Sequence, residues 1–403
     1  MKKIFFILIP LVLLTTGCWN YRELNEMAIV GALGIDYDEE KDMFITTAQI
    51  FNAKKTSTDS ASSSSGQSPI TVYKSEGKTV HESLRNMIYE SPKKLYIGHL
   101  DIIIFGESYA KKGFISGGDF LFRDNESRQD FNMLMVENGK ASDVLKILTP
   151  LIPVPSISVK KTILSNSKFK GTSSQLTYDR LLSNYYTQGI NPVIPIISIK
   201  GDPKEAETDE ITKESTPSTK LVINTIGVFK EDKYVGSLNE EESFGYNLIT
   251  DNIKGNVTSF KCDDKNNYAS IEITKTKSKI AGKIKNNKPS VKVNITVEGG
   301  ISEYNCKLNL KLPKNIKKVE DMVKKHLESI VKKTIETAQK KYNSDIFGFG
   351  EGFLRNNYKY WKKEGKNWYK LFPDLDYKVS IDVNISKKGS VITSTKGGKK
   401  LGR

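Results

Sequence analysis

The second half of the chain alternates apolar and polar residues with a period of two, and this pattern constrains the fold most strongly. Ala269, Ile271 and Ile273 are separated by polar side chains, and the same alternation recurs over residues 291–297 and 304–312. Because successive side chains of a strand point to opposite faces, these segments predict an antiparallel sheet with one buried face and one face in water.

One long amphipathic helix is predicted over residues 316–342. Its apolar side chains recur at spacings of three and four residues and form one face: Val319, Met322, Val323, Leu327, Ile330, Val331, Ile335 and Ala338. Residues 220–386 are therefore predicted to form an α+β domain in which a mainly antiparallel sheet packs against this helix. If that domain holds two subdomains, the split is expected near residues 282–292.

Strands and helices are interspersed over residues 18–200, which predicts a mixed α/β domain. Pro192 and Pro195 favour an edge position for the strand expected over residues 193–199, because proline cannot donate a ladder hydrogen bond. Residues 201–219 carry six acidic side chains and almost no core-forming ones, so they are predicted to be an acidic linker or loop. The predicted fold class is thus α+β and multi-domain.

Residues 1–17 have the organisation of a signal peptide. Two lysines precede an apolar run over residues 4–14, which is too short to cross a bilayer because a spanning helix needs about 20 residues. The small residues before Cys18 resemble a bacterial lipobox, although Thr15 stands where such sites most often have leucine. We therefore expect cleavage after Gly17 and attachment of diacylglycerol and a fatty acyl chain to Cys18, with no other cofactor.

The chain has a formal net charge of +15. Export removes most nucleic-acid partners, so no nucleic acid is expected and this charge favours anionic lipid headgroups or cell-wall polymers as partners. The alternative is that the lysines only solvate helix faces and the backs of sheets. Residues 387–403 carry six positive charges and no acid, and they are predicted to form a basic, disordered tail.

Residues that could carry catalysis or hold a metal are scarce. The histidines, His81, His99 and His326, lie far apart and have no second ligand at metal-binding spacing, so no metal site is predicted. The sequence has neither the Gly-x-Ser-x-Gly elbow of an esterase nor a Walker-type phosphate loop. We predict that the protein is not an enzyme. A cell-wall hydrolase stays an alternative, because the carboxylate pair of a glycosidase has no recognisable spacing.

Two cysteines, Cys262 and Cys306, remain besides Cys18. An oxidising compartment permits a disulfide between them if their strands are neighbours. Cys306 lies on an apolar strand face, where a buried free thiol is an equally good interpretation. The sequence leaves both alternatives open.

Several segments carry a family resemblance, in the same order along the mature chain. They are Cys18-Trp19-Asn20-Tyr21-Arg22-Glu23, Gly34-Ile35-Asp36, Leu95-Tyr96-Ile97-Gly98-His99-Leu100, Phe122-Arg123-Asp124-Asn125-Glu126, Gly227-Val228-Phe229-Lys230 and Asp345-Ile346-Phe347-Gly348-Phe349-Gly350, followed by Trp361 and Trp368. In these segments the chain resembles the Ger(x)C family, the C subunits of nutrient germinant receptors in endospore-forming bacteria.

The resemblance implies a lipoprotein on the outer face of the spore inner membrane, where it works with a membrane-embedded A subunit and a transporter-like B subunit. Nutrient binding would belong mainly to those partners, and the C subunit would serve receptor assembly or signalling. Candidate contact residues lie beside the anchor and within the motifs: Trp19, Arg22, Glu23, His99, Arg123 and Asp124. Trp19 suits the headgroup interface of the membrane.

The competing interpretation of these residues is structural, with Arg123, Asp124 and Glu126 forming an internal salt-bridge cluster. For the whole chain, the alternative function is a lipid-anchored solute-binding protein of a transporter. Such proteins usually have two parallel-sheet lobes joined by a hinge, and the antiparallel pattern of the second half argues against that function.

Overall fold

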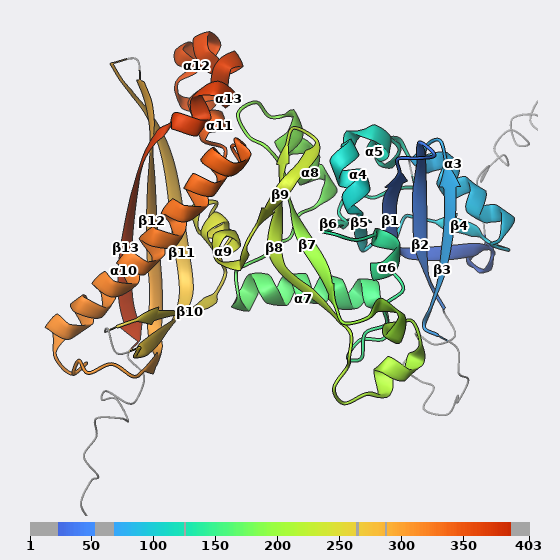
Figure 1. Cartoon of the computed structure of the whole chain (residues 1–403), viewed down its shortest axis with the longest axis horizontal. Coiled ribbons are helices and arrows are strands. Elements are labelled where there is room, and N and C mark those ends of the chain that lie inside the picture. Colours follow the sequence, from blue (N-terminus) through green and yellow to red (C-terminus); the bar gives the residue numbers. More distant parts are fainter. Residues whose placement is uncertain (1–22, 53–67, 125, 263–265, 287, 388–403) are drawn as a thin grey trace, which may run out of the picture.

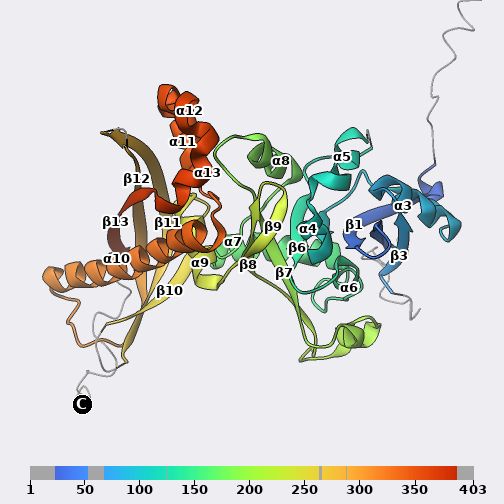
Figure 2. The same ribbon diagram turned by 45° about the horizontal axis from the view of Figure 1, so that its top comes forward.

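The computed structural model describes residues 23–52, 68–124, 126–262, 266–286 and 288–387. Within these ranges the chain is elongated, with a mixed sheet toward one end of its long axis and a second sheet at the other (Figures 1 and 2). Helices pack on both sheets. The predicted α+β fold class is confirmed.

The first sheet runs in the order β3-β2-β1-β5-β6-β7-β8-β9, with β4 beside β1. Its strands are β1 (Met27–Asp38), β2 (Met43–Phe51), β3 (Ile70–Gly77), β4 (Lys94–Tyr96), β5 (Ile102–Phe105), β6 (Asn132–Val136), β7 (Val193–Lys200), β8 (Lys220–Lys230) and β9 (Lys233–Leu238). Strands β1, β5, β6 and β7 are parallel neighbours. The central strands β5 and β6 are buried along their whole length, as expected of parallel strands that helices cover on both faces.

Helices lie on both faces of this sheet (Figure 1). The helices of this part of the chain are η1 (Leu24–Glu26), α3 (Val80–Asn86), η2 (Met87–Tyr89), α4 (Glu107–Lys112), α5 (Ile115–Arg123), α6 (Ala141–Val144), α7 (Pro155–Phe169) and α8 (Tyr178–Tyr186). Successive side chains of β5 point to opposite faces of the first sheet. Ile103 and Phe105 join the core under α4, α5 and α8, whereas Ile102 and Ile104 join the core under α6 and α7.

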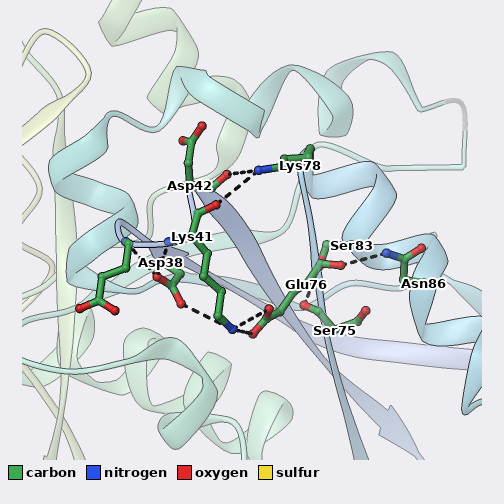
Figure 3. Close-up of polar contacts among 9 residues, drawn as sticks. Asp38, Lys41, Asp42, Ser75, Glu76, Lys78, Ser83 and Asn86 are labelled. Atoms are coloured by element: carbon green, nitrogen blue, oxygen red, sulfur yellow. Dashed lines mark hydrogen bonds and ion pairs between the residues drawn. The ribbon is translucent and has the colours of Figure 1, made fainter.

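Helix α3 is fixed to strand β3 by side-chain hydrogen bonds (Figure 3). Ser83 Oγ donates to the carbonyl of Ser75 at 2.7 Å, and Asn86 Nδ2 donates to the carbonyl of Glu76 at 2.9 Å. From the turn between β1 and β2, Lys41 Nζ reaches the carboxylate of Glu76 at 3.0 Å. These contacts set the position of α3, which forms one wall of a cavity described below.

Residues 201–219, predicted to be an acidic linker or loop, form the loop that connects β7 to its antiparallel neighbour β8 within the first sheet. They contain the short helices η3 (Pro203–Ala206) and η4 (Asp209–Lys213), with Ala206 and Ile211 buried. The hairpin of β8 and β9 therefore completes the first sheet, although the sequence assigned it to the second domain. The alternation of β8 indicates a strand, but it does not indicate which strand lies beside it.

The edge position predicted for β7 is wrong, because β7 lies between β6 and β8. Strand β6 pairs only with Ile196 and Ile197. Pro195 thus lies beyond this short ladder, and its missing N–H group does not interrupt the pairing with β6.

The second sheet runs in the order β10 (Asn256–Lys261), β11 (Tyr268–Lys285), β12 (Lys288–Tyr304) and β13 (Asp376–Lys387). The first three strands pair antiparallel, and β13 runs parallel to β12. The sheet is mainly antiparallel, as predicted. Strands β11 and β12 pair along their length, so the split considered near residues 282–292 falls on a hairpin turn within one sheet.

The predicted long helix is present as α10 (Pro313–Glu336) followed by a π-helix, η5 (Thr337–Tyr342), and it crosses one face of the second sheet (Figure 1). Val319, Val323 and Leu327 share a buried core with Val293 and Ile295 of β12. The other helices of this region are α9 (Glu240–Ile249), α11 (Phe349–Asn356), α12 (Tyr358–Glu364), η6 (Gly365–Asn367), α13 (Trp368–Leu371) and η7 (Phe372–Asp374).

A disulfide joins Cys262, directly after β10, to Cys306, which follows β12, across a sequence separation of 44 residues. Closing a loop of this size restricts the unfolded chain, so we expect Cys262→Ala or Cys306→Ala to lower the free energy of unfolding by roughly 2–4 kcal/mol. Urea unfolding with and without a reductant measures this. The reductant should destabilise the natural chain and leave both variants unchanged, and a variant that still responded to it would contradict the prediction.

Candidate functional site

The predicted contact residues that the structure describes lie in three places: Glu23 precedes β1, His99 lies between β4 and β5, and Arg123 and Asp124 lie at the end of helix α5. Cys18, Trp19 and Arg22 lie outside the described residues. Glu23 is exposed and accepts a hydrogen bond from Asn25 Nδ2 at 2.9 Å. It directly precedes η1 and β1, so the chain passes from its N-terminal segment straight into the first sheet.

The first residues of β1 lie beside β4, which forms one wall of a cavity of ≈ 160 Å³. Met27 pairs with Lys94, and Ala28 pairs with Leu95. The other walls come from α3, from η2 and from α5 with the residues that follow it. The lining residues are Leu84, Arg85, Ile88, Lys94, Leu95, Ile97, Phe120, Asp124 and Glu126.

The charged residues around this cavity do not form the cluster that the sequence suggested. Glu126 makes an ion pair with Lys94, and Asp124 Oδ1 accepts the backbone N–H of Glu126 at 2.8 Å. Arg123 pairs with Asp119 at 2.6 Å, one turn earlier on α5. The prediction fails because Arg123, the last residue of α5, pairs with a residue of its own helix, and Asp124, where the backbone becomes extended, makes its hydrogen bond to the backbone of Glu126.

His99 lies in the loop between β4 and β5, where it is exposed. Its ring meets Tyr96 edge-on, with the ring centroids 5.7 Å apart. The cavity lining includes Asp124 but not His99, so the structure brings only part of the predicted set together.

A larger groove of ≈ 520 Å³ lies between α5 and α8. It is lined by Ile115, Asp119, Phe122, Arg123, Tyr178, Leu182 and Tyr186. Phe122 is 59% exposed and Tyr186 is 71% exposed, and at the cavity on the other side of α5 Ile88 is 53% exposed. We call Ile88, Phe122 and Tyr186 the α5 surface.

Sequence reasoning missed the α5 surface, because apolar residues at helical spacing are normally assigned to the core. One signal was available. Leu121 and Phe122 are adjacent on a helix, about 100° apart, so both cannot face the same core. The structure buries Leu121 completely and leaves Phe122 exposed.

A buried joint links the first sheet to the helices that follow α10. The loop before β7 supplies Gly189 and Asn191, and the loop after η5 supplies Asp345. Asn191 N–H donates to the carbonyl of Asp345 at 2.7 Å, and Glu351 N–H donates to the carbonyl of Gly189 at 3.0 Å. Gly189 has a φ of +81°, and a Cβ there would lie 2.4 Å from the backbone carbon of Gly350, so the joint requires glycine.

The carboxylate of Asp345 is fully buried in this joint. It accepts hydrogen bonds from the backbone N–H groups of Phe347, Phe349 and Gly350 at 3.2, 3.1 and 2.8 Å, and from the indole of Trp368 at 2.9 Å. Burial raises the pKa of Asp345 to about 6, although these hydrogen bonds lower it. Residues 345–350, which carry part of the family resemblance, therefore have a structural role: Asp345 caps the start of α11 within the buried joint.

Asp36, from an earlier motif, has a similar role on the first sheet. Its carboxylate accepts the backbone N–H groups of Ala141 and Ser142 at 2.8 and 3.1 Å, at the start of α6. Burial raises the pKa of Asp36 above its usual value. The buried carboxylates of Asp36 and Asp345 thus each accept the free backbone N–H groups at the start of a helix.

Within the described ranges, no group of three or more His, Cys, Asp or Glu side chains is placed to hold a metal ion. His81 stacks on Phe120 with ring centroids 4.5 Å apart, and His326 Nε2 lies 3.2 Å from Thr258 Oγ1. In the same part of the chain, none of the helices has the length and apolar character that crossing a bilayer requires. The features that remain are the cavity, the α5 surface and the buried joint.

Two family models match successive parts of the chain. The model of the spore germination protein N-terminal domain matches residues 20–199, and that of the spore germination B3/GerAC-like C-terminal region matches residues 224–389. Together they cover both sheets and the joint between them.

Several relatives are similar over nearly their full length. Spore germination protein KC of Bacillus subtilis (strain 168) is 28% identical over 94% of this chain and 93% of its own. Spore germination protein GerQC of Bacillus cereus is 26% identical over 96% of this chain and 99% of its own. The crystal structure of the GerBC protein matches 91% of this chain and 100% of that chain, with a TM-score of 0.53 and 19% identity, and shares its fold.

Proposed function

The chain belongs to the Ger(x)C family of spore germination proteins, as its sequence motifs predicted, and on that premise we propose that it is the lipid-anchored C subunit of a nutrient germinant receptor. Acyl chains on Cys18 would hold it on the outer face of the spore inner membrane. It would serve receptor assembly or signalling together with the membrane-embedded A and B subunits, without catalysis and without nucleic acid.

The position of the α5 surface relative to the anchor carries this proposal. Glu23 follows Cys18 by five residues, which span at most about 18 Å at 3.3–3.6 Å per residue. The chain then enters β1 beside β4, which walls the cavity under α5. Exposed apolar side chains beside a cavity or groove commonly mark protein interaction sites, and Ile88 lines the cavity while Phe122 and Tyr186 line the groove. A partner embedded in the same membrane could reach these side chains.

We expect Ile88→Glu combined with Phe122→Glu to weaken contact with the receptor subunits, because burying a carboxylate in an apolar interface is costly. The amount of the partner subunits that co-purifies with the protein from spore membranes should fall at least tenfold, and nutrient-triggered germination should slow. Both side chains are more than half exposed, so the fold should persist.

The matched control is Leu151→Glu, which changes an apolar side chain that is 96% exposed in the loop before α7. It should leave co-purification unchanged. Equal losses in the control and the double variant would place the contact elsewhere. A deletion strain that germinates normally to every nutrient would overturn the proposed function itself.

A further inference from the structure

The second sheet has one covered face and one open face. Val291, Val293 and Ile295 of β12 point toward the core shared with α10, and α9 and α11 pack against β11 from the same core. On the opposite face, every second residue of β11 from Lys275 to Lys285 is exposed. Figures 1 and 2 show α10 crossing the covered side of the sheet.

The open face is rich in lysine. Strand register places these lysines on it: Lys277, Lys279, Lys283 and Lys285 of β11, Lys288 and Lys292 of β12, and Lys378 of β13. None of these seven makes an ion pair with a residue that the structure describes, whereas Lys275 beside them pairs with Glu298 at 3.2 Å. Asp376 and Asp382 are the acidic residues of β13 on this face. The face therefore carries a marked positive excess. We call it the lysine face.

Two cross-strand pairs on the lysine face bring like charges together. Lys285 lies opposite Lys288 at the hairpin end, and Lys292 lies opposite Lys378. Like charges directly opposite each other in a sheet are unfavourable. Lysines that merely solvated the sheet would be more stable interspersed with acids. An anionic partner would relieve the repulsion.

We infer that the lysine face binds the surface of an anionic bilayer through the phosphate-bearing headgroups of its lipids. Along β11 the lysine face is about 33 Å long, from residue 275 to 285 at ~3.3 Å per residue. Its charges are spread along this length and do not converge on one point. This arrangement suits a flat array of headgroups. Lysine stems are long and flexible, and each lysine near an anionic surface favours binding about fivefold.

The lysine face lies on the second sheet, whereas β1, which the chain enters after Glu23, lies in the first sheet, toward the other end of the long axis (Figure 1). An acyl anchor on Cys18, five residues before Glu23, and the lysine face would attach the protein to the membrane at two separated places. The inference goes beyond the proposed receptor role and does not require it, because the contact depends on residues 275–378 alone.

The test uses the chain from Trp19 to Arg403, which keeps every described residue and lacks Cys18. Binding is measured by co-sedimentation with vesicles of phosphatidylcholine alone and of phosphatidylcholine with 30% phosphatidylglycerol, at low and at 0.5 M salt. The triple variant Lys277→Gln, Lys279→Gln, Lys283→Gln should bind the anionic vesicles at least tenfold more weakly. The natural chain should bind them at low salt and release them at high salt.

The matched control removes three exposed lysines from α10, as Lys318→Gln, Lys325→Gln, Lys332→Gln, with the same loss of net charge. It should bind within about threefold of the natural chain. Equal weakening in both variants would show that only net charge matters and would overturn the inference. So would the absence of binding to anionic vesicles, or tighter binding to soluble polyglutamate than to vesicles, which would identify an acidic polymer as the partner. None of these outcomes bears on germination, so the receptor role would be unaffected.

Discussion

Replacing Cys18 with alanine should move the protein from the membrane fraction to the soluble fraction and abolish the response of spores to nutrient. The proposed anchor supplies at least two acyl chains, and each buried methylene contributes about 0.8 kcal/mol. One chain holds a protein marginally and two hold it durably, so removing all of them is decisive. Fractionation of spore membranes measures the release, and loss of optical density after addition of nutrient measures germination.

Fractionation should be done in 0.5 M salt, which screens any contact of the lysine face with lipid. The matched control is the double variant Cys262→Ala, Cys306→Ala, which removes the other cysteines and should stay in the membrane fraction. If the Cys18 variant also stayed there, or if the natural mature chain carried no acyl mass on its first residue, the anchor would be excluded. The proposed compartment and partners would then lose their support.

Asp345→Ala should destabilise the fold by roughly 3–6 kcal/mol. The variant leaves four buried donors, the N–H groups of Phe347, Phe349 and Gly350 and the indole of Trp368, without an acceptor. Each buried, unpaired donor costs about 1–3 kcal/mol. At neutral pH the variant also avoids the cost of burying a charged carboxylate, which offsets part of this destabilisation. Urea unfolding measures the difference, and Asp374→Ala, at an exposed ion pair with Lys340, is the control that should stay within about 0.5 kcal/mol.

The destabilisation by Asp345→Ala should also depend on pH. Burial raises the pKa of Asp345 from 3.8 to about 6, so the folded state binds the proton more tightly than the unfolded state. This contribution to stability is complete below about pH 3.8 and is lost as the pH rises through 6. The difference in the free energy of unfolding between the natural chain and the variant should therefore be about 1 kcal/mol larger at pH 5 than at pH 7.5. A pH-independent difference would show that the carboxylate keeps its ordinary pKa in the fold.

The elements of the second domain were largely predictable. Alternation over residues 269–297 identified strands and their buried face, and the spacing of Val319, Val323 and Leu327 identified the helix that covers them. The strand predicted from the alternation over residues 304–312 is wrong, because β12 ends at Tyr304 and residues 305–312 form bends and turns. These are local patterns, because the period of a strand or a helix is set by the geometry of its own backbone. The family was predictable for a similar reason, since its motifs are short and continuous.

The candidate site was less predictable. The sequence singled out Asp124, which lines the cavity, but not Phe122 or Tyr186, because apolar residues in helices are expected inside. Asp345 and Trp368 appeared in motifs whose role was unassigned. Their contact joins residues 23 positions apart and depends on how α11 and α13 pack, and the joint also needs Gly189, which no motif included.

The sequence by itself determined most of the helices and strands and which of their faces are apolar, because each of these depends on neighbouring residues. The lipid attachment that it predicts at Cys18 stays a prediction. Only the tertiary structure decided that the β8–β9 hairpin joins the first sheet, that Asp345 closes a buried joint, and that lysines of three strands share one open face. The physical reason is that strand neighbours are chosen through backbone hydrogen bonds, which almost every residue can make and which therefore leave no mark in the sequence.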